Sequence, residues 1–420
     1  MRFEFATATR IIFGRGTIQE VGPLAAEMGS SAFVVTGRTV ERAEPVLSRL
    51  KNHAISYVTF SVTGEPTTTI VKAAVDQARQ AGPNLVIGIG GGSVLDTGKV
   101  VAAMLTNSGR LEQYLEVVGE GKPITQRPLP YIAIPTTAGT GAEVTRNAVL
   151  GAVEHKVKVS MRSPLMVPRV AVVDPALTDS LPLALTASTG LDALTQLIEA
   201  YVCNKANPLT DGICREGIKR AGRSLRKAYE DGGNRSARDD MALASLLSGL
   251  ALANAGLGAV HGFAGPLGGM IAAPHGVICA RLLPIVCQAN VQALCRVGFN
   301  PPNQKRMVGQ APPYLDALAR YDQIAQLLIG KATAKTIDGV AWLQELCADL
   351  AVPSLAEFGL SEQDFPAVIA KAKKSSSMKG NPITLTDDEL MEILKEAVKQ
   401  IKYCATAARK IGRINDEASL

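Results

Sequence analysis

Four side chains in the middle of the sequence could perform metal-dependent or acid–base chemistry. Asp192 and Gln196 lie four residues apart in "STGLDALTQLIEAY", a spacing that places both on one face of a helix. His261 and His275, two of the four histidines in the chain, lie in "VHGFAGPLGGMIAAPHG". Each also has an ordinary structural interpretation, Asp192 as a helix cap and His275 as a turn residue after Pro274. The residue types are therefore compatible with a metal site and equally with ordinary structural roles.

A second group of residues could bind phosphate. Three consecutive glycines stand between an expected strand and an expected helix in "VIGIGGGSVLDTGK": Gly90, Gly91 and Gly92. Glycine allows unusual backbone angles and lets main-chain N–H groups approach an anion, toward which the helix directs its positive end. Ser93 is expected at the N-cap, with Asp96 completing a capping box and lying near Lys99 on the helix surface. Structural turns of this type are also common.

The segment "IPTTAGTGAEVT" (134–145) strengthens the phosphate-binding interpretation. Its hydroxyl groups alternate with glycines after another expected strand: Thr136, Thr137 and Thr140, with Gly139 and Gly141. Ligands of parallel sheets bind beyond the carboxyl ends of the strands. Two such loops in one domain therefore predict a nucleotide site, the alternative being two ordinary polar turns.

Apolar periodicity predicts the elements that must position these residues. Short β-branched runs are expected to be strands: 31–37, 56–62, 84–90, 131–137 and 170–175. Amphipathic segments between them are expected to be helices: 39–51, 68–82 and 93–107. After about residue 180, long Ala- and Leu-rich segments predict helices alone. The expected fold class is therefore α/β plus all-α: a Rossmann-like parallel-sheet domain over 1–180 and an all-helical domain over 181–420.

Composition excludes several other classes. The chain has 420 residues, of which 47% are hydrophobic and 20% charged, as in ordinary globular proteins. Its net charge of +6 is accompanied by no nucleic-acid-binding motif, and part of the excess lies in the tail 399–413. The apolar run 249–273 is mostly Gly and Ala with a His and a Pro, which favours packed helices over a membrane span. Neither nucleic acid nor a membrane is expected as a partner.

The cysteines and the N-terminus predict a cytoplasmic protein. The seven cysteines form no C-x-x-C pair, so reduced and mostly buried thiols are expected rather than disulfides or a cysteine metal site. The first residues lack the pattern of a signal peptide. His53 and His155 are expected to be ordinary surface residues.

Eight segments together resemble the iron-containing (group III) alcohol dehydrogenase family, in order from about residue 5 to 395. They are "GEPT" (64–67), "GGGSVLDTGK" (90–99), "PTTAGTGAEVT" (135–145), "KVS" (158–160), "VVDP" (172–175), "STGLDALTQLIEAY" (188–201), "PHG" (274–276) and "SSMKGNP" (376–382). The Pro-, Gly- and Asn-rich segment 297–314, an expected surface loop, and the basic tail fall outside the resemblance.

The resemblance implies a dinucleotide-binding domain, a helical domain, an active site in the cleft between them, and hydride transfer between a nicotinamide cofactor and an alcohol/aldehyde pair. It places the glycine loop and Ser93 at the pyrophosphate. Along the nucleotide it places Thr136, Thr137, Thr140 and Lys158, and Asp96 is also expected among the cofactor-binding residues. It also implies a small-molecule alcohol or carbonyl substrate and a homodimer.

The same resemblance implies one divalent ion, Fe²⁺ or Zn²⁺, held by an Asp and three His. Asp192, His261 and His275 occupy three of these positions, which makes the two histidines the expected catalytic residues. Gln196 occupies the fourth, and its neutral amide oxygen is a poorer ligand than imidazole. Another His frequent in the family is replaced by Gly265, so metal-bound water or the cofactor ribose is expected to supply the proton.

Three interpretations follow from the replaced histidine. In the first interpretation, Asp192, His261 and His275 hold a catalytic ion, with or without help from Gln196. Three protein ligands suffice for a catalytic metal in general. Alternatively, the protein is a metal-independent reductase of an oxo-acid, as in the maleylacetate reductase branch, or a nucleotide-binding protein with a degraded site. A lyase of the dehydroquinate synthase type shares the architecture, but the eight segments oppose it.

The first long strand bears on the choice of nicotinamide cofactor. It ends in "VVTGRT", with Gly37 and Arg38 where members that prefer NAD often have an acidic residue. Without that acid a ribose 2′-phosphate is not repelled, and Arg38 could pair with it. The alternative is a solvated turn arginine. NADP is therefore the expected cofactor, with NAD usable.

Overall fold

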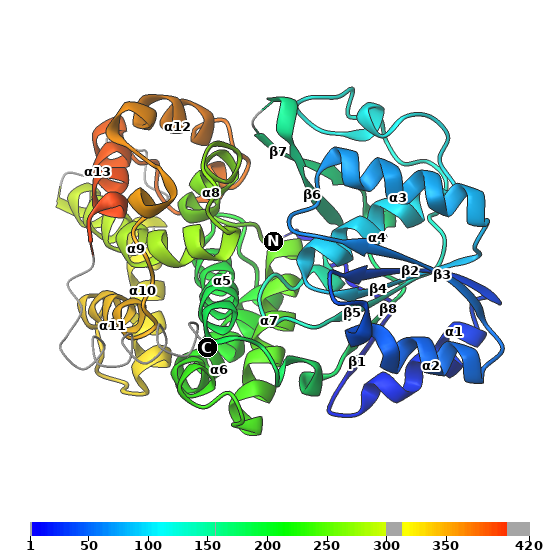
Figure 1. Ribbon diagram of the computed structural model, residues 1–420. Helices are drawn as coiled ribbons and strands as arrows, with labels where there is room; N and C mark the ends of the chain where they lie inside the picture. The colour runs from blue at the N-terminus through cyan, green and yellow to red at the C-terminus, as the bar shows by residue number, and fades with distance from the viewer. Residues whose placement is uncertain (1, 156, 300–312, 401–420) are drawn as a thin grey trace. The chain divides into compact units, whose positions relative to one another are not determined.

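The computed structural model describes residues 2–155, 157–299 and 313–400 (Figure 1). The chain forms two compact units, each built from two segments: Met1–Leu181 with Gly232–Asn254, and Pro182–Asp231 with Ala255–Leu420. The first segment ends next to the boundary expected near residue 180. Helix α7 (Arg235–Asn254), expected in the helical domain, belongs instead to the first unit.

A six-stranded, all-parallel sheet forms the centre of the first unit, as the β-branched runs predicted. In spatial order its strands are β1 (Arg10–Phe13), β8 (Val170–Val173), β5 (Tyr131–Pro135), β4 (Leu85–Gly90), β2 (Ser31–Gly37) and β3 (Ser56–Val62). The short edge strand β1 was not predicted, nor was the antiparallel hairpin of β6 (Asn147–Ala152) and β7 (Val157–Arg162). Four residues are too few to establish an alternating pattern, and no Asn-Gly or Asp-Gly turn marks the hairpin.

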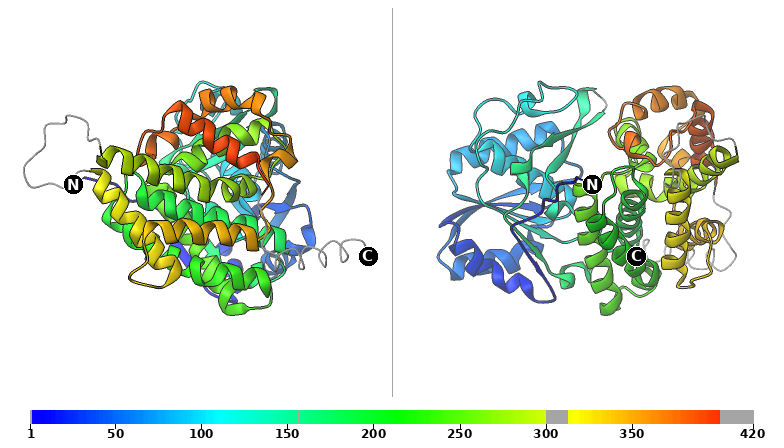
Figure 2. Two further views of the ribbon diagram at one scale, coloured as in Figure 1. Left: turned by 90° about the vertical axis from the view of Figure 1, so that its left-hand side faces the viewer. Right: turned by 180° about the vertical axis from the view of Figure 1, so that it is seen from behind.

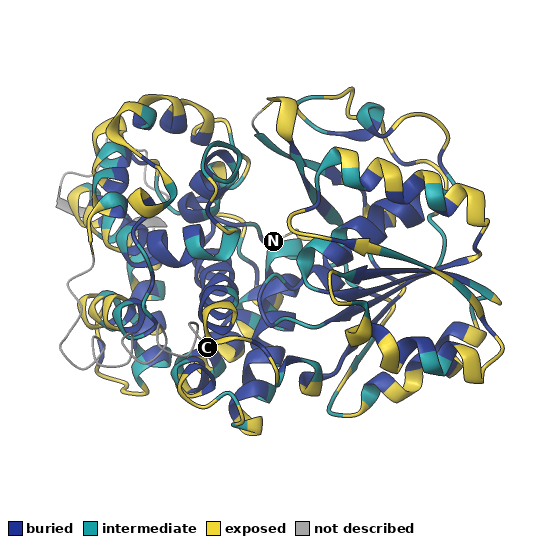
Figure 3. Ribbon diagram, in the orientation of Figure 1, coloured by how far each residue is buried: buried dark blue, intermediate teal, exposed yellow. Residues whose placement is uncertain are grey.

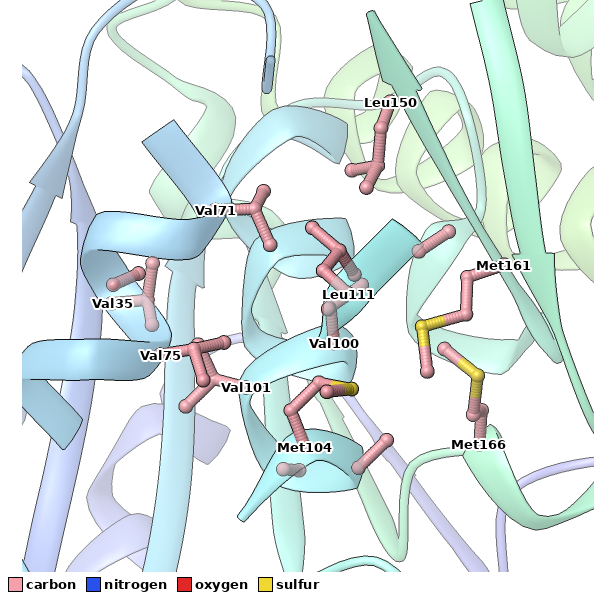
Figure 4. Close-up of a cluster of buried hydrophobic side chains, with 14 of the residues drawn as sticks. Val35, Val71, Val75, Val100, Val101, Met104, Leu111, Leu150, Met161 and Met166 are labelled. Carbon is pink, nitrogen blue, oxygen red and sulfur yellow. The ribbon is translucent and has the colours of Figure 1, made fainter. Parts of the chain in front are cut away.

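Helices cover both faces of this sheet. Figure 1 shows α1 (Val21–Ala26) and α2 (Glu44–Asn52) on one face, and α3 (Thr68–Ala81) and α4 (Gly92–Met104) on the other. The faces form separate apolar cores because successive strand residues point to opposite sides. The core around α3 and α4 also includes the hairpin, which contributes Leu150 and Met161 (Figure 4). Figure 3 shows the central strands of the sheet buried between these layers.

The helix predicted over 39–51 begins later than expected. Residues Val40–Ala43 form a 3₁₀ turn, and α2 starts at Glu44. Pro45 lies in the first turn of α2, where its missing N–H group costs no hydrogen bond.

The strand order creates one natural ligand-binding position. Strand β2 lies between β3 and β4, so the chain moves from β2 toward one edge of the sheet and then returns to its other side. Ligands of open α/β sheets bind at such a switch point, beyond the carboxyl ends of the strands. Gly37 ends β2 and Gly90 ends β4, so the predicted cofactor residues of both strands meet at this position.

The second unit is all helical, as expected. Its helices are α5 (Leu183–Val202), α6 (Pro208–Glu230), α8 (Ala259–Met270), α9 (His275–Phe299), α10 (Pro313–Ile329), α11 (Thr336–Asp349), α12 (Phe365–Ala372) and α13 (Asp387–Val398). In the left view of Figure 2 its long helices run side by side. Helix α5 is buried along nearly its whole length from Thr186 onward, because the other helices of the unit surround it.

Two apolar segments bear on the membrane question. The run 249–273 is divided between α7 and α8, which belong to different units, so it is not one helix. Among the described residues, His275–Val297 is long and apolar enough to span a membrane, but 67% of its apolar window is buried inside the structure, as in a core helix.

The six described cysteines are free and five of them are buried. The predicted loop 297–314 and the basic tail lie largely outside the described residues.

Candidate functional site

The glycine loop forms the N-terminus of α4, with the N-cap two residues earlier than expected. Gly91 is the N-cap, and its carbonyl accepts from the N–H groups of Val94 (3.0 Å) and Leu95 (3.1 Å). Ser93 is therefore the second residue of the helix, and the prediction that it caps the helix was wrong. No side chain caps α4, so nearby main-chain N–H groups remain available to an anion.

Of the three glycines, Gly90 and Gly92 are needed for space, and none of the three is needed for unusual backbone angles. None of them has a positive φ, so that part of the expectation was wrong. A Cβ atom on Gly90 would lie 2.5 Å from Val94 Cγ2, and one on Gly92 would lie 3.0 Å from Thr140 Oγ1. Side chains at Gly90 and Gly92 would therefore crowd Val94 and Thr140, whereas a Cβ atom on Gly91 would lie at an ordinary contact distance of 3.4 Å from Thr137.

The threonine loop lies directly against the glycine loop. The Thr136 N–H donates to the Gly90 carbonyl (3.0 Å), while Thr137 and Thr140 face the positions that Cβ atoms of Gly91 and Gly92 would occupy. The tertiary structure thus brings together the two nucleotide-binding segments expected from the sequence. Contact with a cofactor stays a prediction for each of these residues.

Helix α7, which comes from a distant part of the sequence, packs against the threonine loop of the first unit. Gly141, with φ of +60°, lies so close to α7 that a Cβ atom on Gly249 would be 2.2 Å from its carbonyl oxygen. The Ser248 hydroxyl donates to the Gly139 carbonyl (3.3 Å). Helix α7 therefore supports the threonine loop from behind.

Asp96 anchors α4 to the hairpin instead of completing a capping box. Its Oδ1 accepts from Lys99 Nζ (3.0 Å) and its Oδ2 from the Val149 N–H (2.9 Å). Lys99, expected on the surface, is 1% exposed and also donates to Thr145 Oγ1 and the Asn147 carbonyl (both 2.8 Å). The capping-box prediction was wrong because the N-cap is Gly91 and both carboxylate oxygens of Asp96 bond to Lys99 and to the distant Val149. A cofactor contact for Asp96 stays a prediction.

Beside this network lies a buried carboxyl group that the sequence did not single out. Burial of Glu143 raises its pKa to about 7, while its own backbone N–H and the Lys99 charge act in the opposite direction. The folded protein therefore holds this proton more tightly than the unfolded chain does. The corresponding stability is present at low pH and is lost as the pH rises from about 4.5 through about 7.

Glu143→Gln is expected to remove this pH dependence. The amide stays neutral, so the variant should unfold like the wild type near pH 5 and be more stable by about 2 kcal/mol near pH 8. Thermal unfolding midpoints of both proteins across this range measure the effect. Parallel pH profiles would show that the carboxyl group is not destabilised by burial.

The remaining predicted cofactor residues lie near the carboxyl ends of β2 and β3. Lys158, on β7, places Nζ 2.7 Å from Glu65 of the "GEPT" segment, so the two segments are joined by an ion pair. Arg38 is exposed directly after β2, and nothing lies within 4 Å of where a Gly37 Cβ atom would be. The end of β2 is therefore open.

The predicted metal residues come together in the second unit. Asp192 is in the middle of α5, His261 is the third residue of α8, and His275 is the first residue of α9. Asp192 Oδ1 lies 3.4 Å from His261 Nε2 and 3.8 Å from His275 Nε2. Cys279 Sγ joins them at 3.7 Å from each Nε2 atom. All four ligand-type atoms lie within 4.8 Å of one another.

This group, called the α5/α8/α9 cluster below, fits a divalent cation. Asp192 is 2% exposed, and its Oδ1 has no hydrogen-bond partner. A buried carboxylate oxygen without a partner is costly, and a cation among the four atoms would satisfy it. Carboxylate oxygen, imidazole nitrogen and thiolate sulfur are the ligands that zinc accepts, and the first two also suit iron.

Glu199 orients the cluster from behind. Its carboxylate accepts from His261 Nδ1 and from the Val260 N–H at the start of α8, both at 2.6 Å. With Nδ1–H held in this way, Nε2 is directed toward Asp192 and Cys279, and its lone pair would be offered to a cation there once Nε2 is deprotonated. Carboxylate–histidine pairs of this kind orient metal ligands in many proteins.

The "SSMKGNP" segment holds the same helix start. Asn381 Oδ1 accepts from the Ala259 N–H (3.1 Å), and Asn381 exchanges hydrogen bonds with Asn290 of α9. A Cβ atom on Gly380 would lie 2.2 Å from the Leu257 carbonyl oxygen. The motif therefore fixes where α8, and with it His261, begins.

Charges in the cluster stabilise one another. Burial alone would raise the pKa of Asp192, but His275 and His261 outweigh it and hold the pKa below its ordinary value. For His261, burial opposes the charged form, whereas Cys279, Glu199 and Asp192 favour it and hold its pKa well above the ordinary value. Burial raises the pKa of the Cys279 thiol to about 12.

Two residues of this site were not found from the sequence. Cys279 lies four residues after His275 and Glu199 seven after Asp192, so helical spacing could have placed each on the same helix face as a predicted ligand, but not against His261 of another helix. Gln196 lies buried next to Asp192, with its amide Nε2 3.4 Å from Asp192 Oδ2. Its role as a ligand stays a prediction.

Comparison with known proteins agrees with this architecture along the chain. Residues 8–175 match the family described as iron-containing alcohol dehydrogenase, and residues 186–398 match the C-terminal part of the Fe-containing alcohol dehydrogenase family.

Individual relatives match over nearly their whole length. Alcohol dehydrogenase 4 of Saccharomyces cerevisiae (strain YJM789) is 33% identical, with 92% of this chain and 96% of the relative covered. The 1,3-propanediol dehydrogenase of Citrobacter freundii is 34% identical, covering 94% and 98%. A crystal structure of a 1,3-propanediol oxidoreductase superposes with a TM-score of 0.84 at 33% identity, covering 94% of this chain and all of that one. The chain therefore belongs to the iron-containing alcohol dehydrogenase family, and it is an oxidoreductase of alcohols and their carbonyl counterparts.

Proposed function

We propose that the protein reversibly transfers a hydride between NAD(P)H and a small aldehyde or ketone, assisted by one divalent ion in the α5/α8/α9 cluster. The observation that carries the metal part is the buried Asp192 Oδ1 atom, which has no hydrogen-bond partner and faces two imidazoles. Asp192, His261 and His275 would hold the ion. Bound there, a divalent ion supplies a Lewis acid that polarises a carbonyl oxygen, and a nicotinamide supplies the hydride.

The protein's own residues position these two groups. The α4 N-terminus and the threonine loop offer main-chain N–H groups and hydroxyls to a dinucleotide. Glu199 holds the His261 ring, so that Nε2 keeps one direction throughout the reaction. Gly265, one helical turn after His261, has no side chain that could act as an acid or base. The space where its Cβ atom would be is open, with nothing within 4 Å. The proton is therefore expected from outside this position.

Metal content and turnover together test the proposal. Protein loaded anaerobically with Fe²⁺ or Zn²⁺ and then desalted is expected to retain about one ion per cluster. Aldehyde-dependent oxidation of NAD(P)H should require that ion and stop on chelation. Chelator-resistant reduction of an oxo-acid would favour the metal-independent alternative. Cofactor binding without any carbonyl-dependent turnover would indicate a degraded site.

For the cofactor we propose a preference for NADP, with NAD usable. The exposed Arg38 and the open position beside Gly37 support it, because both follow β2 at the switch point of the sheet. No acidic side chain stands at these two positions to accept hydrogen bonds from a ribose 2′-hydroxyl.

Arg38→Ala is expected to lower kcat/KM for NADPH by roughly 10- to 100-fold and to change that for NADH little. A charge-assisted hydrogen bond to a phosphate contributes about 1.5–3 kcal/mol, and only NADPH carries the 2′-phosphate. Steady-state kinetics with both cofactors measure the ratio, with Arg42→Ala as a neighbouring control. An equal loss for both cofactors would argue against 2′-phosphate recognition.

The assembly and location stay predictions. A homodimer would be seen by light scattering of the purified protein, and a cytoplasmic location by cell fractionation.

A further inference from the structure

We infer that the Cys279 sulfur is a protein ligand of the proposed ion, in the fourth position that the family resemblance assigns to Gln196. The inference rests on the proposed function, because it concerns the same ion. The centre would then consist of one carboxylate, two imidazoles and one thiolate.

The distances in the cluster match the edges of a tetrahedron around one ion. With nitrogen and oxygen ligands at about 2.0–2.1 Å, neighbouring ligand atoms of a tetrahedral zinc site lie about 3.4 Å apart, and about 3.6 Å where one is sulfur at about 2.3 Å. Asp192 Oδ1 lies 3.4 Å from His261 Nε2, equal to this edge, and 3.8 Å from His275 Nε2, which is longer than it. Cys279 Sγ is 3.7 Å from Nε2 of both His261 and His275. The sulfur is therefore placed like a ligand.

Helix α9 presents Cys279 and His275 together. They are four residues apart at the start of the helix, so both side chains lie on the face toward α5 and α8. The close packing of α9 on α5 depends on Gly276, where a Cβ atom would lie 2.6 Å from the Ser188 carbonyl oxygen. Cys279 is fully buried at this contact, so its position is set by helix packing.

Gln196 has a different partner. Its amide nitrogen points to Asp192 Oδ2, while the oxygen without a hydrogen-bond partner, Oδ1, faces the imidazoles. The amide can thus act as a hydrogen-bond donor that sets the rotation of the carboxylate. We assign Gln196 the part of a positioning residue, which leaves the fourth ligand position to the thiol.

The other cysteines lack this setting. Among the described residues, the metal-type grouping includes Cys279 and no other cysteine. Cys287 lies two turns further along the same helix, buried with its pKa raised by burial, and Cys347 donates to the Ala280 carbonyl (3.4 Å). Cys287 is therefore a matched control for Cys279.

A thiolate ligand changes which ion is preferred. Coordination breaks the S–H bond, releases the proton to solvent and forms a sulfur–metal bond. Soft sulfur favours zinc and related thiophilic ions, whereas iron(II) with oxygen and nitrogen ligands gains less from it. Four protein ligands leave substrate to enter as a fifth, a number that catalytic zinc can reach. The prediction is a zinc-type centre on an iron-family fold.

Cobalt(II) is the probe that reports the sulfur directly. Wild type, Cys279→Ser and Cys287→Ser are loaded anaerobically with Co²⁺ and desalted, and metal content and absorption spectra are measured. Wild type and Cys287→Ser are expected to show a near-ultraviolet sulfur-to-cobalt charge-transfer band. Cys279→Ser should lack the band and bind cobalt at least about tenfold more weakly.

A double variant separates loss of a ligand from loss of the fold. Cys279→Ser combined with Gln196→His restores an imidazole on α5, so it is expected to regain cobalt without regaining the sulfur band. Thermal unfolding midpoints of all variants accompany the spectra. Recovery of cobalt binding would show that the serine variant fails for want of a ligand.

The outcomes distinguish this inference from the proposed function. Wild type that binds one cobalt per cluster without a charge-transfer band overturns the role of Cys279 and leaves metal-assisted catalysis standing. Wild type that binds neither cobalt nor zinc, yet still reduces carbonyl compounds, overturns the metal part of the function and the inference together.

Discussion

His261→Ala is expected to abolish metal retention and carbonyl reduction together. The side chain joins the cluster through Nε2, 3.4 Å from Asp192 and 3.7 Å from Cys279, and no neighbouring imidazole can replace it from α8. Lewis-acid polarisation contributes several kcal/mol, so kcat/KM should fall by about 10³-fold or more. Metal analysis after anaerobic loading and NAD(P)H oxidation with the best aldehyde measure the two effects.

A matched control distinguishes this loss from general damage. His155→Ala removes an exposed histidine of the first unit and is expected to keep both metal and activity. Cofactor affinity, measured by calorimetry, should be similar in both variants, because the loops predicted to bind the nucleotide belong to the other unit. Full activity of His261→Ala would rule out a catalytic ion in this cluster. The same test applies to His275→Ala.

Glu199→Gln is expected to weaken metal binding by about 100-fold, although Glu199 is not itself a member of the cluster. Its carboxylate accepts two hydrogen bonds of 2.6 Å, from His261 Nδ1 and the Val260 N–H. An amide has one oxygen for these two donors and would turn its own N–H₂ group toward one of them. Loss of such partners typically costs 10- to 100-fold in metal affinity, and the unsatisfied donor is buried here.

Competition with a chromophoric chelator measures that affinity. Glu216→Gln, which removes a carboxylate from an exposed ion pair with Arg220 on α6, is the control and should change nothing measurable. Unchanged zinc or cobalt affinity in Glu199→Gln would show that the hydrogen bonds to α8 do not hold the imidazole in place. A lower affinity with an unchanged unfolding midpoint would assign the effect to ligand orientation.

Local sequence patterns predicted most of the strands and helices, because residue type and apolar spacing determine local backbone structure. The strands Ser31–Gly37 and Ser56–Val62 have the predicted bounds, since short runs rich in β-branched and aromatic residues between turn residues have few alternatives. The helix predicted over 68–82 is α3, ended by Gly82 at a φ of +57°. Helix starts were less predictable: Ser93 is not an N-cap, because the preceding glycine already adopts helical geometry.

By itself, the sequence determined the order of the elements, the parallel sheet, the helical second half and the residue types of both sites. Long-range packing decided the rest. It joined α7 to the α/β unit, buried Lys99 with Asp96, and brought Glu199 and Cys279 against residues from other helices. Spacing along one helix shows which side chains share a face. It does not show which other helix packs against that face, because such contacts join residues far apart in the chain. Glu199 and His261, for example, are more than sixty residues apart. The proposed thiolate ligand could therefore be recognised only in the folded protein.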